Sequence, residues 1–356
     1  MAKKLTIRDV ASAANVSIAT ISRVLNNSSV PSDEIRDRVQ KIIEQLDYVP
    51  QKPGRKKRRP EEPSKARSRS TRTIGLVMAP RIFYDFSEGE LYLARLINGI
   101  HEAVGSYDCN LRVFTHDGSQ SIPPLITKTR MDGLLIDDHI PPAVQRTLKD
   151  LMPVVFIDSS PRGVAGSSVR PNFETAISDI LTYLWDLGHR DIAMFKAANS
   201  PMINPPMMAA YSRFFAEHSY EPRVQSLNVP RDITSATHFQ VMEQYAGDIL
   251  AAPTRPTAVV AEDVYAARIH VELTKLGVTL PEAMSLVGID DTTVALHLEP
   301  QLTSYRFPMD EIGKASIDEL FQCIENPSRS PRQIFLDGKI IERASVAPPP
   351  DIVPGS

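Results

Sequence analysis

Residues 18–26 interleave one arginine with short hydroxyl and small apolar side chains, a combination that can read the edges of base pairs. In the major groove, Arg23 can bond guanine through two hydrogen bonds, and Ile18 or Ala19 can touch a thymine methyl group. Hydroxyls such as those of Thr20 and Ser22 can hold backbone phosphates. Polarity alone leaves a plainer interpretation open, in which these side chains form the solvated outer face of a surface helix.

Three short helical patterns over residues 6–46 would place this run on the middle helix of a small bundle. Thr6 can cap a first helix, Asn15 can adopt the left-handed conformation that ends it, and Ser17 can cap the second. Pro31 and Ser32 open a third helix with an acidic first turn. Because each helix has only a small apolar stripe, we expect the three to pack together. The stripes are Ile7, Val10, Ala11 and Ala14; Ile21, Val24 and Leu25; and Ile35, Val39, Ile42, Ile43 and Leu46.

The formal charge is divided between a basic head and an acidic body. The 356 residues carry −3 in total, whereas residues 1–72 hold 17 Lys and Arg against 8 Asp and Glu and so carry +9. The remainder therefore carries −12. This division indicates that only the head meets a polyanion, and nucleic acid is the obvious candidate.

The head resembles the headpiece of the LacI/GalR repressor family. The resemblance is dense over residues 5–11 (LTIRDVA), 16–26 (VSIATISRVLN) and 48–50 (YVP). It implies a transcriptional regulator, usually a repressor, that binds a pseudo-palindromic operator in double-stranded DNA as a homodimer. It also implies base contacts by Ile18, Ala19 and Arg23, and phosphate contacts by Thr6, Ser17, Thr20, Ser22 and Asn26.

The stretch after the head departs from that family, in which a short hinge helix carries a leucine that wedges into the minor groove. Residues 51–57 (QKPGRKK) keep the family's arginine as Arg55, but Lys57 replaces the leucine and Pro53-Gly54 disfavours a helix. Residues 51–72 are therefore predicted to be a basic, flexible linker. We expect its basic run to contact DNA, through Arg55, Lys56, Lys57, Arg58 and Arg59. A merely solvated linker is the alternative.

From Thr73 onward, short apolar runs alternate with helical stretches, which is typical of parallel sheets covered by helices on both faces. Helical periodicity is clearest over Leu91–Ala103, Ala176–Leu187 and Ala266–Leu276. Ligands of such sheets bind at the carboxyl ends of the strands, and between two lobes this edge becomes a closing cleft. The predicted strands are Ile74–Met78, Leu111–Phe114, Gly133–Ile136, Val154–Ile157, Ile192–Phe195, Ala258–Ala261 and Ser285–Ile289.

The family resemblance extends from Thr73 to about Arg343 and implies the architecture of periplasmic sugar-binding proteins. The expected fold class is a small all-α helix-turn-helix head followed by a two-lobed, periplasmic-binding-protein-like α/β domain with parallel sheets. Lobe 1 would comprise about 73–160 and 301–326, and lobe 2 about 166–297 and 330–345, with crossings near 159–166 and 297–302. The whole division is a head at 1–50, a linker at 51–72, an effector-sensing and dimerisation domain at 73–345 and a tail at 346–356.

The interlobe cleft is expected to bind a small-molecule effector, sugar-like or another small metabolite. Asp290 matches the family's ligand-contacting aspartate, and Asp138, Tyr92 and Glu262 are further candidates. Residues 199–210 lack the family's sugar-clamping arginine, which disfavours a simple hexose or a phosphorylated sugar. The methionines Met202, Met207 and Met208 in this stretch favour a more apolar pocket wall, with plain core packing as the alternative. A regulator without any effector also stays open.

Other functions find little support in the sequence. No nucleophile elbow, phosphate loop or metal-binding His pair is present, so we expect neither an enzyme nor a cofactor or metal site. Asp290 and Asp291 are adjacent carboxylates, but neighbours at a strand end point in opposite directions. The two distant cysteines, Cys109 and Cys323, are expected to be inert thiols. Without a signal peptide or a run of ~20 apolar residues, we expect a cytoplasmic protein with no membrane contact rather than a solute-binding protein for transport.

Overall fold

The structure, a computed structural model, describes residues 7–17, 20–21, 24, 32–46, 72–78, 86–119, 121–122, 124–137, 140–158, 163–195, 204–221 and 235–350. Within these ranges, the side chains of residues 7–8, 33, 86–92, 204 and 235–239 are not described. The chain divides into two compact units, Met1–Arg69 and Ser70–Ser356. None of the helices in the described ranges combines the length and apolarity needed to cross a membrane.

The first unit is a small helical head. Helix α1 (Ile7–Ala13) ends at Asn15, whose φ of 53° is the predicted left-handed conformation. The Ser17 Oγ then accepts a hydrogen bond from the Thr20 amide at 3.1 Å, as a cap at the start of a helical turn does. Helix α3 (Asp33–Gln45) follows Ser32. The three apolar patterns share one core, as expected, made of Val10, Ala11, Ala14, Ile21, Val24 and Val39.

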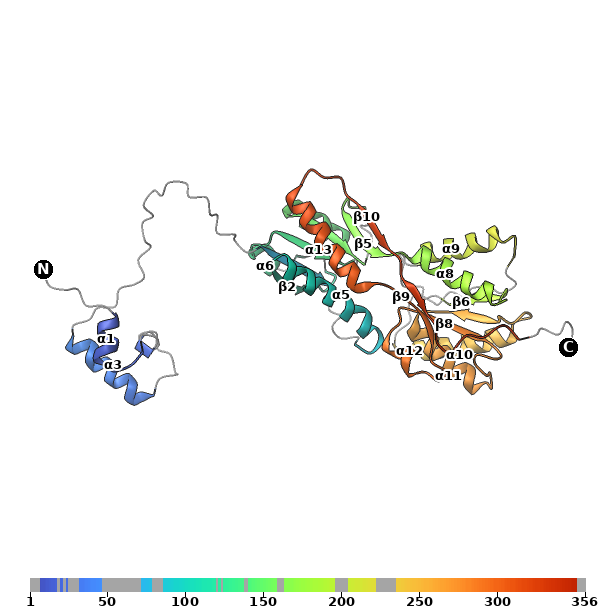
Figure 1. Cartoon of the computed structure of the whole chain (residues 1–356), viewed down its shortest axis with the longest axis horizontal. Coiled ribbons are helices and arrows are strands. Elements are labelled where there is room, and N and C mark those ends of the chain that lie inside the picture. Colours follow the sequence, from blue (N-terminus) through green and yellow to red (C-terminus); the bar gives the residue numbers. More distant parts are fainter. Residues whose placement is uncertain are drawn as a thin grey trace. The chain divides into compact units, whose positions relative to one another are not determined.

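The second unit contains two lobes (Figure 1). Lobe 1 is built on a sheet with the strand order β10-β5-β4-β3-β1-β2. All its strand pairs are parallel. Successive residues face opposite sides: Leu76 packs with α5 and α13, and Val77 with α6 and α7. The strands are β1 (Thr73–Met78), β2 (Asn110–Thr115), β3 (Gly133–Ile136), β4 (Val154–Ile157), β5 (Ser167–Pro171) and β10 (Gln333–Leu336), and the helices α5 (Phe86–Ser106), α6 (Pro124–Lys128), α7 (Pro142–Leu151) and α13 (Met309–Glu325).

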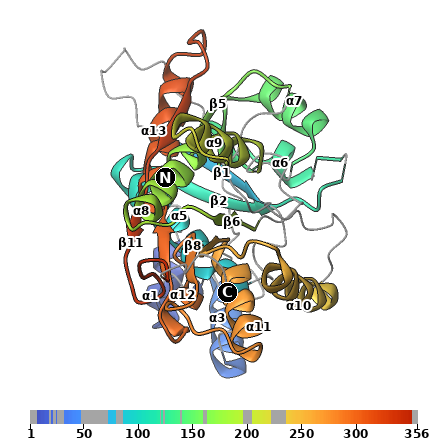
Figure 2. The ribbon, with the colours of Figure 1, turned by 90° about the vertical axis from the view of Figure 1, so that its right-hand side faces the viewer.

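Lobe 2 is built on a sheet with the order β11-β9-β8-β7-β6, in which only β11 runs antiparallel to its neighbour among the described strands. Figure 2 shows α8 and α9 on one side of this sheet and α10 and α11 on the other. The strands are β6 (Ile192–Met194), β7 (Ala258–Val260), β8 (Ser285–Ile289), β9 (Thr303–Arg306) and β11 (Lys339–Ile341), and the helices α8 (Phe173–Asp186), α9 (Asn204–Glu217), α10 (Ser235–Ala251), α11 (Asp263–Lys275) and α12 (Thr293–His297).

The chain crosses between the lobes later than the apolar runs suggested. It crosses from β5 to α8, from β9 to α13 and from β10 to β11, rather than near 159–166 and 297–302. The expected lobe bounds were therefore wrong for three strands. Strands β5 and β10 belong to lobe 1, and β9 belongs to lobe 2.

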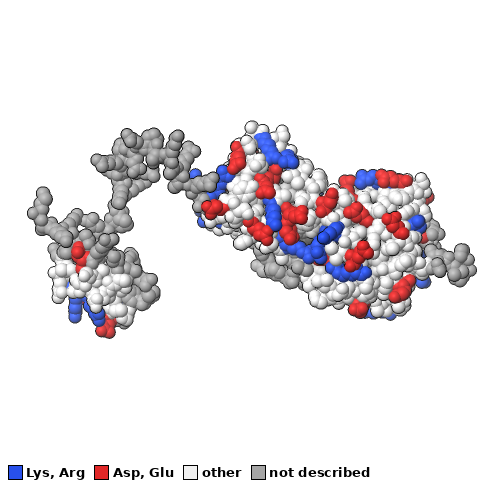
Figure 3. Space-filling view, in the orientation of Figure 1, with Lys and Arg blue, Asp and Glu red and all other residues white. Residues whose placement is uncertain are grey.

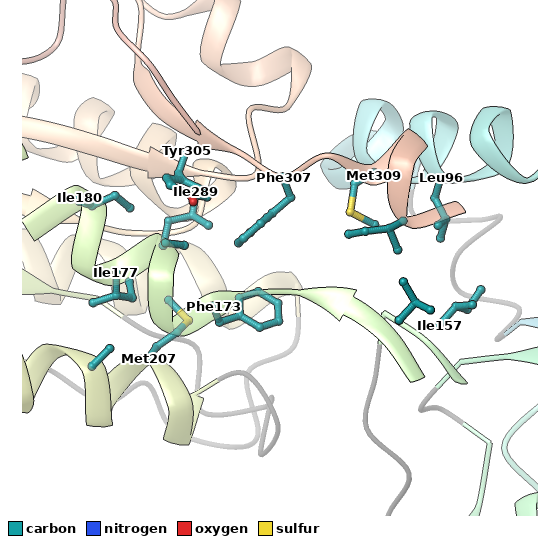
Figure 4. Packing of buried hydrophobic residues seen from close by; sticks show 14 of the residues in the cluster. Leu96, Ile157, Phe173, Ile177, Ile180, Met207, Ile289, Tyr305, Phe307 and Met309 are labelled. Carbon is teal, nitrogen blue, oxygen red and sulfur yellow. The ribbon is translucent and has the colours of Figure 1, made fainter. Parts of the chain in front are cut away.

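The hydrophobic core continues through these crossings. Phe173, after the first crossing, meets Phe307 of the second edge to face, with ring centroids 5.1 Å apart. Figure 4 shows the two rings between Leu96 and Ile157 of lobe 1 and Ile177 of lobe 2. Packed side chains therefore join the two lobes along these crossings.

Candidate functional site

Ser17 and Thr20 are the predicted DNA-contacting residues that lie in the described part of the head. Their hydroxyl oxygens are 2.8 Å apart, with Ser17 exposed and Thr20 half-buried. Two hydroxyls at the start of a helical turn lie where the helix dipole favours an anion, so they can bind a DNA phosphate. The other predicted contacts lie outside the described residues: Thr6, Ile18, Ala19, Ser22, Arg23 and Asn26, and the linker residues 55–59.

In the second unit, four carboxylates occupy the carboxyl ends of strands from both lobes, and we call them the acidic cluster: Asp158, Glu262, Asp263 and Asp290. Glu262 and Asp263 follow β7 and Asp290 follows β8 in lobe 2, whereas Asp158 follows β4 in lobe 1. Burial raises the pKa of Asp290 well above its usual range, and the charges of Glu262, Asp263 and Asp158 add to the rise. The charge of Asp158 in lobe 1 therefore acts on Asp290 in lobe 2 across the lobe boundary.

Two of the four predicted effector residues thus lie together in the acidic cluster, and the structure places two further carboxylates beside them. Asp290 and Glu262 were predicted, whereas Asp158 and Asp263 were not. Asp158 directly follows a predicted strand, so the rule that ligands bind at strand carboxyl ends could have found it. Asp138 and the side chain of Tyr92 lie outside the described residues.

The acidic cluster holds protons near neutral pH. Burial, with a smaller effect from the Asp263 charge, raises the pKa of Glu262 to about 7. Burial also raises the pKa of Asp263 to about 6, although hydrogen bonds from Ser304 and Thr292 oppose the rise. A cluster of this kind can both donate and accept hydrogen bonds, and it favours ligands that bring hydroxyl or positively charged groups.

Asp263 organises the turn that carries Asp290. It is fully buried, and its Oδ1 accepts a hydrogen bond from the Ser304 hydroxyl at 2.6 Å. Its Oδ2 accepts from the Thr292 amide at 2.6 Å and from the Thr292 hydroxyl at 3.0 Å. The same Ser304 oxygen accepts from the Asp291 amide at 3.0 Å. Asp263 therefore fixes the backbone on both sides of Asp291.

Asp291 faces arginines rather than the acidic cluster. Its buried carboxylate pairs with Arg306 at 2.6 Å, with Arg343, and with Arg95 at 3.5 Å. Burial alone would raise the pKa of Asp291, but hydrogen bonds from Arg343 and Arg306 outweigh it and lower the pKa below its usual value. The two aspartates have separate surroundings, as expected, but a left-handed turn separates them, with φ of 100° at Asp290 and 48° at Asp291.

Other residues named in the sequence serve packing. Met207 is 4% exposed in the core beside α8, so the packing interpretation holds for it. His189 is buried, with its ring nitrogens 2.9 Å from the Thr257 hydroxyl and 2.8 Å from the Ala347 carbonyl. Cys109 and Cys323 are unpaired and half-buried, and burial raises the pKa of both thiols. Over the described ranges, no group of three or more His, Cys, Asp or Glu is arranged to hold a metal ion.

The acidic cluster makes stability depend on pH. A carboxyl group whose pKa rises on folding stabilises the fold fully below its unfolded value, and this contribution is lost as pH rises through the folded value. For Glu262 the loss runs from the ordinary pKa of 4.5 to the folded pKa of about 7. We expect wild type to lose roughly 2 kcal/mol of unfolding free energy through this group between pH 5 and 8.

Urea unfolding at the two pH values checks this expectation. Glu262→Gln is expected to reduce the pH dependence, because the amide does not titrate. Glu282→Gln, at an exposed position, is the matched control and keeps the wild-type dependence. An equal pH dependence in wild type and Glu262→Gln contradicts the assignment.

Known proteins that resemble this chain form one class, in which a DNA-binding head is followed by a two-lobed binding domain. Residues 6–51 match the family described as bacterial regulatory proteins, lacI family, and residues 181–346 match the periplasmic binding protein-like domain. The ribose operon repressor of Haemophilus influenzae is 26% identical over 352 residues, which cover 96% of this chain and 98% of the relative.

Two solved structures share the fold. A complex of the transcriptional regulator CelR with cellobiose has a TM-score of 0.64 and 23% identity, covering 96% of this chain and 99% of the other. A lac repressor dimer bound to operator and the anti-inducer ONPF also has a TM-score of 0.64, at 20% identity, covering 97% of this chain and all of the other. The predicted fold class is confirmed.

The chain belongs to the LacI family of bacterial regulatory proteins, with a helix-turn-helix head and a periplasmic-binding-protein-like domain. The three similar proteins are a ribose operon repressor, a transcriptional regulator and a lac repressor, in agreement with the prediction of a regulator rather than an enzyme.

Proposed function

We propose that this protein is a cytoplasmic transcriptional repressor that binds a pseudo-palindromic operator as a homodimer and responds to a small effector in the interlobe cleft. The observation that carries the proposal is the pairing of a capped helix-turn-helix head with carboxylates from both lobes that act on one another at the carboxyl ends of the strands. The lac repressor relative, described as a dimer bound to operator, supports the same arrangement. Two heads related by a two-fold axis fit two half-sites.

Most of the proposed DNA contacts lie on the helix that begins at Ser17. Ile21 and Val24 of this helix are buried in the head core, 0% and 5% exposed. Helical periodicity of 100° per residue predicts that positions 19 and 23 lie on the side away from these two. We assign base contacts to Ile18, Ala19 and Arg23, and phosphate contacts to Thr6, Ser17, Thr20, Ser22 and Asn26.

We propose the following role for each part of the chain. We assign DNA binding to residues 1–50, the flexible linker to 51–72, effector sensing and dimerisation to 73–345 and a tail to 346–356. In the linker, charge would replace the family's apolar wedge, because five consecutive Lys and Arg at 55–59 can neutralise phosphates.

Changing residues 55–59 to alanine is expected to flatten the salt dependence of operator binding. Removing one phosphate contact lowers the slope of log affinity against log salt concentration by about 0.9, so removing up to five from each protomer of the dimer changes it by up to about 9. Fluorescence anisotropy at several salt concentrations measures the slope. The matched control changes Lys65, Arg67 and Arg69, later in the same linker, to alanine. An unchanged slope in the 55–59 variant would assign this run to a solvated linker.

The proposed effector carries several hydroxyl or positively charged groups. Asp290 and Glu262 accept hydrogen bonds from it, and Asp138 and Tyr92 are further contacts. The cellobiose complex of the CelR relative supports a polyhydroxylated ligand. The acidic cluster disfavours anions such as phosphorylated sugars, since its carboxylates would repel a bound anion.

Selection of bound sequences from random duplex DNA, with the full-length protein at near-physiological salt, tests the proposed function. A two-fold symmetric motif is the expected result, because it requires both base reading and a symmetric dimer. Binding that depends on salt but not on sequence would reject the operator-binding proposal. Differential scanning fluorimetry with cellobiose and ribose then tests the cleft, and a stabilisation that Asp290→Asn abolishes supports the effector site. A regulator without an effector predicts that no small molecule stabilises the protein.

A further inference from the structure

We infer that Asp291 couples the effector cleft to lobe 1 through Arg95, as a positioning residue that relays the state of Asp290. The inference rests on the proposed function, because it assumes that the acidic cluster binds the effector. It concerns a contact that lies outside the cleft and that no proposed effector group touches.

Asp291 collects arginines from three different elements. Arg306 ends β9, directly before the chain crosses to lobe 1, and Arg343 follows β11 of lobe 2. Arg95 comes from α5 of lobe 1. The carboxylate is therefore bonded within lobe 2 by two arginines and to lobe 1 by one. Since Asp290 is its neighbour in a turn fixed by Asp263, a shift at Asp290 moves Asp291 as well.

The bond to lobe 1 is the one most able to change. The distance from Arg95 to Asp291 is 3.5 Å, at the limit for a hydrogen bond, whereas Arg306 lies at 2.6 Å. The Nη1 of Arg95 is buried and has no hydrogen-bond partner within the described part of the chain. A half-buried guanidinium with a long bond to Asp291 and a buried Nη1 without a partner among the described residues gains free energy if a small movement shortens the contact.

Helix α5 passes such a movement to the rest of lobe 1. A Cβ atom on Gly99 would lie 1.9 Å from the Asp310 carbonyl oxygen, and one on Gly313 would lie 2.4 Å from that of Leu96. Helices α5 and α13 thus touch backbone to backbone, one turn beyond Arg95. Because α13 begins directly after the β9 crossing, the Arg95 contact and the chain itself connect lobe 2 to the same helix pair.

The surroundings leave room for the movement. A pocket of about 360 Å³ borders Arg95 and Arg306, between the start of α13 and the turn at Gly338. Figure 3 shows Lys and Arg side chains gathered on this face where the two lobes meet. Both arginines can therefore change position without displacing packed side chains.

Hydrogen exchange of the full-length protein, with neither DNA nor effector, tests the coupling. Asp290→Asn replaces a titratable carboxyl group of the acidic cluster with an amide that cannot ionise, and it is the probe. We expect it to change exchange rates in α5, across the lobe boundary, by about fivefold. In an Arg95→Gln background the same probe is expected to leave α5 unchanged. The matched control background is Arg72→Gln, which removes an exposed arginine whose partner Glu325 lies in the same lobe, and there the response persists.

Two results overturn the inference. One is an unchanged α5 on Asp290→Asn, and the other is an equal response with and without Arg95. If Arg95→Gln does not fold, Arg95→Lys replaces it, and a reduced response is expected because lysine keeps the charge but not the forked geometry. The outcome is independent of operator selection, since a failed selection rejects the proposed function and leaves the exchange result standing.

Discussion

Gly288→Ala is expected to destabilise the second unit by at least about 3 kcal/mol. A Cβ atom at this position would lie 2.1 Å from Asp263 Oδ1, 2.7 Å from a Leu302 methyl carbon and 2.9 Å from the Ser304 hydroxyl oxygen. Asp263 cannot retreat, because three hydrogen bonds hold its buried carboxylate. The substitution must therefore push β8 away from Asp263 and β9, or break the bonds that organise Asp290 and Asp291.

Urea unfolding of full-length protein measures this effect, and Gly247→Ala is the matched control. Gly247 lies within α10, and nothing approaches its missing Cβ within 4 Å. The control is expected to stabilise the protein by about 0.5–1 kcal/mol, because alanine favours a helix over glycine. If the unfolding free energy of Gly288→Ala lies within about 1 kcal/mol of wild type, the close contact between β8 and Asp263 is not a constraint on the fold.

Apolar runs predicted the strands at the centre of each sheet but missed the strands that join the lobes. The runs at 133–136 and 154–157 match β3 and β4 residue for residue. Strands β5 and β9 were missed because their buried positions include Ser167, Ser168, Thr303 and Ser304. These side chains are buried because each has a hydrogen-bond partner, as Ser167 has in Glu319. Polar strands of this kind carry no apolar signal, which explains the misplaced crossings.

Two residues of the acidic cluster were predictable from the sequence because apolar runs mark the strands that precede them. Asp290 and Glu262 follow apolar strands, where the sequence marks the carboxyl edge of a sheet. Arg95, Arg306 and Arg343 are far apart in the sequence, and only the folded chain brings them to Asp291. Local patterns indicate which strand end a residue occupies, whereas pairing between distant charges depends on how the chain crosses between the lobes.

The surroundings of Asp290, in the proposed effector site, differ in charge from those of Asp291. Asp290 faces carboxylates whose protonation lies near neutral pH, and Asp291 faces arginines that keep it ionised. Burial and the neighbouring carboxylates therefore favour the protonated form of Asp290, whereas the arginines favour the ionised form of Asp291. A ligand that neutralises the acidic cluster changes the electrostatic surroundings of Asp290 without competing for the arginines of Asp291. Ligand binding at Asp290 and transmission to lobe 1 through Asp291 can therefore use separate groups.

Arg23→Ala is expected to lower the affinity of the dimer for its operator by about 30-fold or more, because each of the two bidentate contacts between arginine and guanine contributes roughly 1–3 kcal/mol of base discrimination. Loss of one positive charge also weakens binding to any DNA, but only by about as much as one phosphate contact. The ratio of operator affinity to random-duplex affinity is therefore the decisive quantity, and it is expected to fall toward one. Anisotropy titrations with both duplexes at the same salt concentration give the ratio.

Arg38→Ala is the matched control in the same head. Arg38 lies on α3, where it forms an exposed ion pair with Glu34 at 3.4 Å, and pairs of this kind contribute little to stability. The control removes the same charge, so the general electrostatic loss is equal and the affinity ratio is expected to stay at the wild-type value. If both variants lower operator and random-duplex binding by the same factor, Arg23 acts as a phosphate contact, and base reading falls to Ile18 and Ala19. A fall in the ratio for Arg23→Ala alone places base reading on the helix that begins at Ser17, as the burial of Ile21 and Val24 predicts.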